Sequence, residues 1–252
     1  MALDFYSSRF LRHTTAPSFS VPITVSFWFY PTDSTSTVQR LLNFQDTNCT
    51  KWAYLILNGA TGVVQSDLYD GRIGPPGPSA SGVNFNAWNH LYMVFAGGSN
   101  TCYMALNDGS LQVGSGTTTT GMCTRSRIGD ATVGTTGAGQ VFTGRMAEFG
   151  LWLSDLEVYS TSARHWLAAG YTPLHVRDSA KLSWYLPMYQ RNPVESTTAL
   201  LDEVSKTSWA PSVGMAMAPH PPNIKWPKSG KYVIRTPPVV TAHPRSYGFV
   251  FG

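Results

Sequence analysis

The chain has 252 residues and is poor in charge, with 13% charged and 13% aromatic residues, against roughly 25% charged in an average globular protein. This composition favours strands and tight turns, and the length suffices for one large all-β domain. Cys49, Cys102 and Cys123 are odd in number and lack C-x-x-C spacing, so the sequence indicates neither a disulfide framework nor a structural zinc site. No stretch approaches the ~18 apolar residues that a membrane span needs.

The charges are distributed unevenly along the chain. No acidic residue follows Glu203, whereas six basic residues do: Lys206, Lys225, Lys228, Lys231, Arg235 and Arg245. Residues 1–203 therefore hold 12 of the 18 basic residues and all 14 acidic ones, a net charge of −2. The body is nearly neutral and the tail is basic, so the high isoelectric point does not by itself indicate nucleic-acid binding.

Strand patterns recur from the amino terminus onward. Residues 23–30 alternate Ile23, Val25, Phe27 and Phe29 with Thr24, Ser26, Trp28 and Tyr30, which predicts a strand with one apolar face. Similar strand-length runs follow at 37–44, 52–58, 62–69, 88–96, 101–106, 110–113, 124–129, 144–153 and 182–187. Such regular recurrence predicts two face-packed antiparallel sheets.

Two segments of the sequence predict a turn and a helix between the strands. Asn107-Asp108-Gly109 predicts a hairpin, because an Asp-Gly turn accommodates positive φ. Ser154 and Glu157 form a capping-box pattern ahead of an apolar stripe that ends at Gly170, which predicts one helix packed over an edge or end of the sandwich.

From Pro211 onward the composition changes, because 8 of the 17 prolines lie in the last 42 residues. We therefore divide the chain into a sandwich, residues 1–210, and an extended, proline-rich, basic carboxy-terminal arm, residues 211–252.

The order of features resembles the laminin-G-like members of the concanavalin A-like lectin/glucanase superfamily, of the type found in bacteriophages. The segments that carry the resemblance are Ala2–Phe5, Ile23–Pro31, Phe85–Leu91, Asn107–Gly109, Ile128–Asp130, Gly144–Trp152, Leu153–Glu157 and Lys181–Met188. The resemblance covers residues 2 to 210 and implies a two-sheet antiparallel jelly roll. It also implies a virion accessory or decoration protein, made in the host cytoplasm, which agrees with an amino terminus that lacks a signal-peptide pattern.

An enzyme is not expected. Glycosidases of this superfamily carry a Glu-x-Asp-x-Glu strand, because residues two apart share a face, and no such strand occurs here. Glu148 is flanked at the same-face positions by Met146 and Gly150, and Glu157 is assigned to the helix cap. A glycan hydrolase or lyase that uses a site without a compact signature stays as the least favoured alternative.

The main alternative to a virion protein, favoured over an enzyme, is a lectin-like site that binds host-surface glycans. A loop with Asp67, Tyr69, Asp70 and Arg72 offers an aromatic ring, polar groups and carboxylates that could hold Ca²⁺. The favoured interpretation of this segment is nevertheless a solvated turn, and no calcium ligand set follows from the sequence. We therefore expect no cofactor, with Ca²⁺ as the exception to consider.

The arm is the most informative feature for function. Residues 231–235 can add as a strand to another subunit, and Phe249 and Phe251 can serve as apolar anchors. The residues expected to bind partners are Lys225, Trp226, Lys228, Lys231, Tyr232, Ile234, Arg235, Phe249 and Phe251. The expected partners are the major capsid or tail protein and copies of the chain itself, and neither nucleic acid nor a membrane. The alternative is a tail folded back onto its own sandwich.

Overall fold

The computed structural model describes most of the chain in separate stretches. The described residues are 2–5, 10–13, 20–35, 38–46, 48, 50–69, 77–95, 101–115, 125–130, 140–159, 161–176, 181–188, 200–201, 203–205, 208–211 and 216–225.

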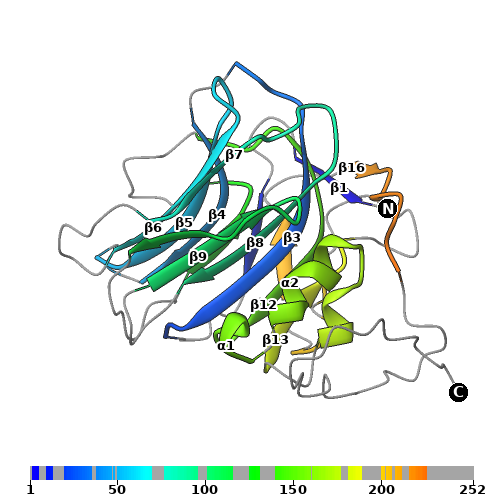
Figure 1. Ribbon diagram of the computed structural model, residues 1–252. Coiled ribbons are helices and arrows are strands. Elements are labelled where there is room, and N and C mark those ends of the chain that lie inside the picture. Colours follow the sequence, from blue (N-terminus) through cyan, green and yellow to red (C-terminus); the bar gives the residue numbers. More distant parts are fainter. Residues whose placement is uncertain are drawn as a thin grey trace, which may run out of the picture.

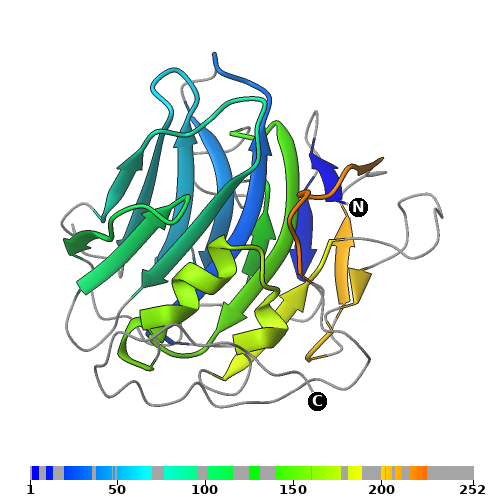
Figure 2. The ribbon, with the colours of Figure 1, turned by 45° about the vertical axis from the view of Figure 1, so that its right-hand side comes forward.

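Two antiparallel sheets pack face to face (Figures 1 and 2). The β3 sheet consists of β1 (Ala2–Phe5), β3 (Ile23–Pro31), β8 (Asn89–Phe95), β9 (Thr101–Leu106), β10 (Gln112–Ser115), β12 (Gly144–Trp152), β13 (Leu182–Leu186) and β16 (Ala216–Ala218). The β5 sheet consists of β2 (Leu11–His13), β4 (Gln39–Gln45), β5 (Trp52–Asn58), β6 (Val63–Tyr69), β7 (Ser79–Ser81), β11 (Arg125–Ile128), β14 (Leu200–Leu201) and β15 (Ser208–Pro211). The predicted all-β, two-sheet fold is confirmed.

The core lies between the two sheets and follows the predicted alternation. In β3, the side chains of Ile23, Val25, Phe27 and Phe29 are at most 1% exposed and belong to the central cluster. Trp184 from the β3 sheet meets Trp209 from the β5 sheet edge to face, with ring centroids 5.2 Å apart. Aromatic rings packed in this way stabilise beyond the area that they bury.

The predicted hairpin joins β9 to β10, although its turn is shifted by one residue. Asn107 and Asp108 have φ of 51° and 61°, and Gly109 N donates to Leu106 O at 2.8 Å. Positive φ at both central positions is the type I′ pattern. The left-handed positions are therefore Asn-Asp, not Asp-Gly as the sequence suggested.

The predicted helix is two short helices, α1 (Leu156–Tyr159) and α2 (Thr161–Ala168), followed by the 3₁₀ turn η1 (Pro173–Val176). Asp155 Oδ1 accepts a hydrogen bond from Glu157 N at 3.0 Å, so Asp155 caps α1. The apolar stripe covers the outer face of the β3 sheet (Figure 2), not an edge or end of the sandwich. Neither described α-helix is long and apolar enough to cross a membrane.

A β-bulge in β12 corrects the expected placement of Glu148. The register of β12 against β3 shifts between Ala147 and Gly150, and Glu148 has a φ of 56°. Met146 and Phe149 both lie in the central core, so the alternation slips by one residue between them. Glu148 consequently does not share a face with Met146, because a bulge re-aims the side chains beyond it.

The last described residues lie on the sandwich. The expected boundary at residue 210 falls inside β15, which pairs with β2, and β16 pairs with β1. Lys225 N donates to Gly170 O at 2.7 Å. Up to residue 225, the described part of the expected arm is thus folded onto its own chain, and residues 226–252 lie outside the described residues.

Candidate functional site

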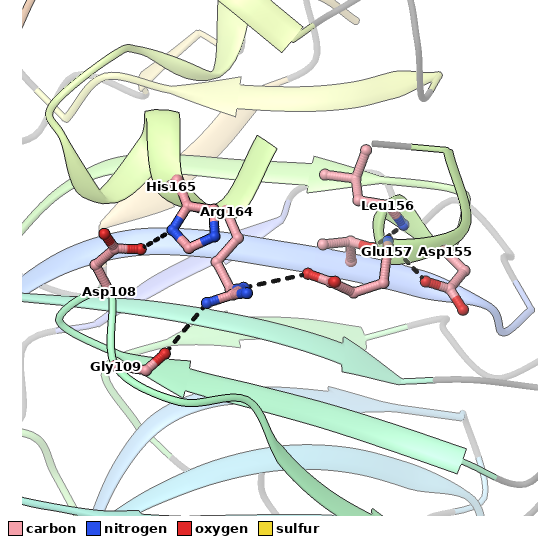
Figure 3. A network of polar contacts seen from close by, with 8 residues as sticks. Asp108, Gly109, Asp155, Leu156, Glu157, Arg164 and His165 are labelled. Carbon is pink, nitrogen blue, oxygen red and sulfur yellow. Dashed lines mark hydrogen bonds and ion pairs between the residues drawn. The ribbon is translucent and has the colours of Figure 1, made fainter. Parts of the chain in front are cut away.

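Helices α1 and α2 lie on the outer face of the β3 sheet, and α2 is bonded to the β9–β10 turn (Figure 3). Arg164 Nη1 in α2 donates to the Gly109 carbonyl at 3.1 Å, and His165 pairs with the Asp108 carboxylate. Arg164 Nε also lies 3.5 Å from Glu157 Oε1 in α1. The helices therefore occupy part of this face, whereas no described helix lies on the outer face of the other sheet.

The outer face of the β5 sheet carries a ladder of polar side chains that we name the polar row. Its members are opposite one another in consecutive strand pairs: Arg12 (β2), Arg127 (β11), Asn43 (β4), Tyr54 (β5) and Asp67 (β6). The residues that alternate with them, Leu11, Ile128, Leu42, Leu55 and Leu68, lie in the core. The polar row therefore points away from the core, because successive side chains of a strand point to opposite faces.

The middle of the polar row is held by Tyr54. Its hydroxyl donates to Asp67 Oδ2 at 2.8 Å, and the Arg40 guanidinium lies 4.0 Å from its ring centroid. Burial and the Asp67 charge raise the pKa of Tyr54 to about 12, so the phenol stays protonated and remains a donor. Burial lowers the pKa of Arg40, opposed by Tyr54, Asp67 and Asp130. Arg40 Nε donates to Gln140 Oε1 at 3.0 Å.

A second ladder runs beside the polar row, with Gln45 opposite both Trp52 and Arg125 in the backbone register. Gln45 is fully buried, and neither of its amide atoms has a hydrogen-bond partner in the part of the chain that the structure describes. Such groups are few in native proteins. Trp52 is half-buried.

The structure describes two of the four residues of the expected glycan-binding loop. Asp67 and Tyr69 belong to β6, so they lie on a strand and not in a loop. Asp67 is in the polar row, and Tyr69 is opposite Trp52 in the register. Asp70 and Arg72 lie outside the described residues. Among the described residues, no group of three His, Cys, Asp or Glu side chains is placed to hold a metal ion.

One of the expected partner-binding residues can be placed, and it contacts its own chain. Lys225 forms an isolated parallel bridge with Tyr171, and its Nζ lies 4.4 Å from the Tyr171 ring centroid. The others lie outside the described residues: Trp226, Lys228, Lys231, Tyr232, Ile234, Arg235, Phe249 and Phe251.

Glu148 belongs to a separate buried cluster. Its side chain is 2% exposed and accepts hydrogen bonds from Tyr185 Oη at 2.7 Å and from His220 Nε2 at 2.9 Å. Burial raises the pKa of Glu148, opposed by His220 and Tyr185. Retaining glycosidases place two carboxyl groups ~5 Å apart. The groups that hydrogen-bond Glu148 in the described chain are a phenol and an imidazole, so the cluster fastens His220 to β12.

The sequence interpretation found Asp67 and missed the other members of the polar row. The alternation of Trp52, Tyr54 and Ile56 with Ala53, Leu55 and Leu57 was a usable signal, because it gives that strand a second face with two aromatic rings. The register that brings Arg12 and Arg127 into line with these rings is set by pairing between strands far apart in the sequence.

Solved structures with the same fold have little sequence identity to this chain. A candidate carbohydrate binding protein from Bacteroides ovatus ATCC 8483 is 13% identical, with a TM-score of 0.61 over 85% of this chain and 58% of that one. A heptameric SAP-like pentraxin from Limulus polyphemus is 14% identical, with a TM-score of 0.53 over 66% and 81%. Domains LG4-5 of the mouse laminin alpha1 chain are 12% identical, with a TM-score of 0.49 over 60% of this chain and 40% of that one. The chain thus spans less than two thirds of the Bacteroides and laminin chains.

No curated protein matches this sequence. The model of one protein family, described as the concanavalin A-like lectin/glucanases superfamily, matches residues 9–158. That match covers more than half of the chain and agrees with the two-sheet sandwich. This protein belongs to the concanavalin A-like lectin/glucanases superfamily.

Proposed function

We propose that this protein binds carbohydrate on the outer face of the β5 sheet. The observation that carries the proposal is the polar row, in which Tyr54 stands between Asn43 and Asp67 on a face that no described helix covers. The row crosses four strand spacings, on the order of 19 Å. That length suits an oligosaccharide chain better than a single sugar ring.

The side chains on this face match what a sugar requires. The half-buried Trp52 and Tyr54 rings provide apolar surface for the C–H face of a pyranose ring, with polar groups beside them. Asp67 accepts and Arg127 donates hydrogen bonds, so both the donor and the acceptor character of sugar hydroxyls can be satisfied. The Bacteroides neighbour, described as a candidate carbohydrate binding protein, shares the fold, and the polar row supplies the chemistry.

A glycan array followed by calorimetry on the purified chain tests this proposal. Trp52→Ala is expected to weaken binding about tenfold, equivalent to about 1.4 kcal/mol. The matched control is Trp88→Ala, which removes a half-buried tryptophan that packs against Tyr30 of the β3 sheet, with ring centroids 5.6 Å apart. Absence of binding to every glycan, or equal loss in both variants, contradicts a site on the β5 sheet.

The second candidate function is that of a virion accessory protein of a bacteriophage, located in the particle and anchored through its tail to a capsid or tail protein. The supporting observation is the segment 216–225, which pairs with β1 and is bonded to Gly170. Because this segment is held on the sandwich, residues 226–252 are joined to the sandwich at a defined point. Those residues hold four basic and no acidic side chains, which suits an acidic partner surface.

Truncation after Lys225 tests this second candidate, since a cut at residue 210 would also remove β16. The truncated protein is expected to fold like the full chain and to be absent from purified particles. Normal incorporation of the truncated protein contradicts anchoring by residues 226–252.

A further inference from the structure

Basic side chains lie along the polar row, and two of them stand together at one end. Arg12 and Arg127 are opposite each other in β2 and β11. Arg40 lies beyond them, over Tyr54. Because residues 1–203 have a net charge of −2, this concentration of arginine is local to the β5 sheet and does not reflect the body as a whole.

The acidic groups on this face neutralise only part of that charge. Arg127 Nη1 lies 3.4 Å from Asp130 Oδ2, and Arg40 interacts electrostatically with Asp67 and Asp130. Arg12 is exposed, and no hydrogen bond or ion pair joins its guanidinium to another residue in the described stretches. A free, exposed guanidinium beside a second one is suited to bind a carboxylate or sulfate through paired hydrogen bonds.

A buried amide without a described partner lies next to the polar row. Gln45 is fully buried one ladder away from Asn43, and its amide oxygen and nitrogen both lack a partner among the described residues. A buried amide with both atoms unpaired is costly unless something else satisfies it.

We infer that the ligand of the β5 sheet is an acidic glycan, whose carboxylate or sulfate lies against Arg12 and Arg127 while its sugar rings extend toward Trp52 and Tyr54. This inference rests on the proposed carbohydrate-binding function and adds the class and direction of the ligand. The direction follows from charge, because the Asp67 carboxylate at the opposite end of the polar row repels an anion.

Calorimetry on the full chain with four polymers tests the inference: polygalacturonate, dextran sulfate, neutral dextran and single-stranded poly(dT). Polygalacturonate or dextran sulfate is expected to bind at least tenfold more tightly than dextran, with affinity that falls as salt is raised. Arg12→Gln is expected to weaken the acidic glycan about tenfold, a loss typical of one charge-assisted hydrogen-bonded pair.

Arg145→Gln is the matched control. Arg145 lies in β12, with its guanidinium 4.8 Å from the Tyr30 ring centroid, so this variant loses the same charge from the other sheet and keeps the basic tail. It is expected to change affinity less than twofold. Equal losses in both variants, or equal affinity for poly(dT), overturn a specific acidic-glycan site.

The outcomes also separate the two proposals. Suppose that dextran and the acidic polymers bind equally, that Arg12→Gln leaves this binding unchanged and that Trp52→Ala abolishes it. The proposal of carbohydrate binding then stands, and the inference of an acidic glycan is overturned. Absence of binding to all the glycans overturns both.

Discussion

The Tyr54 hydroxyl donates a 2.8 Å hydrogen bond to the Asp67 carboxylate across the β5–β6 pair. The two residues are directly opposite each other in the register, at the distance at which cross-strand side chains interact. The charge-assisted bond fixes the phenol orientation, and Arg40 packs over the same ring. The centre of the candidate site is therefore held in place before any ligand arrives.

The first prediction concerns the energy of this pair. Tyr54→Phe and Asp67→Asn should each lower the free energy of unfolding by about 1–2 kcal/mol, because each leaves a polar partner less well satisfied. The double variant should lose less than the sum of the two. Urea unfolding of the four proteins gives the coupling energy, and strictly additive losses would show that the bond does not stabilise the fold.

The second prediction follows from a buried histidine in β8. His90 Nε2 lies 2.8 Å from Ser26 Oγ, and burial lowers the pKa of His90 to about 3. The folded protein therefore keeps His90 neutral, whereas the unfolded chain binds a proton near pH 6.5. The stability that depends on neutral His90 is complete above pH 6.5 and falls between pH 6.5 and 3, by about 1.4 kcal/mol per pH unit.

Urea unfolding between pH 7.5 and 4 measures this slope. In His90→Gln the titrating group is gone, so the difference in stability between wild type and variant should shrink as the pH falls below 6.5. Parallel curves for the two proteins across that range contradict a neutral His90 in the folded state.

The strand pattern of this protein was largely predictable, whereas its candidate site was not. Residues 52–58 and 101–106 alternate so regularly that the predicted bounds match β5 and β9. Such periodicity depends on each strand alone. The polar row depends on which strands become neighbours, as when β11 places Arg127 between Arg12 and Asn43. That choice is made by packing of the whole sandwich.

Glu148 shows a different limit of sequence interpretation. Strict alternation assigned it to the face of Met146, and the bulge moved it into a cluster with His220. A bulge adds one residue to a strand without a distinctive residue type at this position. His220 comes from the tail, so the two halves of the contact carry no common local signal.

The third prediction concerns how the tail segment packs on Gly170. This glycine has a φ of 91°, and a Cβ there would lie 2.1 Å from Asn223 O. Gly170→Ala must therefore both strain the backbone and displace the segment that ends at Lys225. We expect a loss of about 2–3 kcal/mol, of which roughly 1–2 kcal/mol is left-handed backbone strain.

Gly82→Ala is the matched control, because Gly82 has a φ of 95° and nothing within 4 Å of an added Cβ. The Gly82→Ala variant should lose only the stability that corresponds to left-handed backbone strain. Hydrogen exchange of the Lys225 amide, which donates to Gly170 O at 2.7 Å, should accelerate in Gly170→Ala and stay slow in Gly82→Ala. Equal exchange in both variants contradicts docking of the segment at Gly170.

The fourth prediction concerns the buried contact between Glu148 and His220. His220→Ala removes one of the two donors to a carboxylate that is 2% exposed, and it should destabilise the protein by about 3 kcal/mol at pH 7.5, because a buried charge is left underpaired. Burial already raises the pKa of Glu148 and His220 opposes that rise, so the pKa should increase further in the variant.

A carboxyl whose folded pKa lies above its unfolded value gains stability as the pH falls from the folded pKa toward the unfolded one. The loss caused by His220→Ala should therefore be greatest at pH 7.5 and smaller at pH 5, because the raised pKa favours proton uptake at Glu148 as the pH falls. In a Glu148→Gln background the same substitution should cost less and depend little on pH, because no charge is buried. A loss of equal size at both pH values in the Glu148 protein would show that Glu148 is already neutral in the folded state, and that the contact with His220 is an ordinary neutral hydrogen bond.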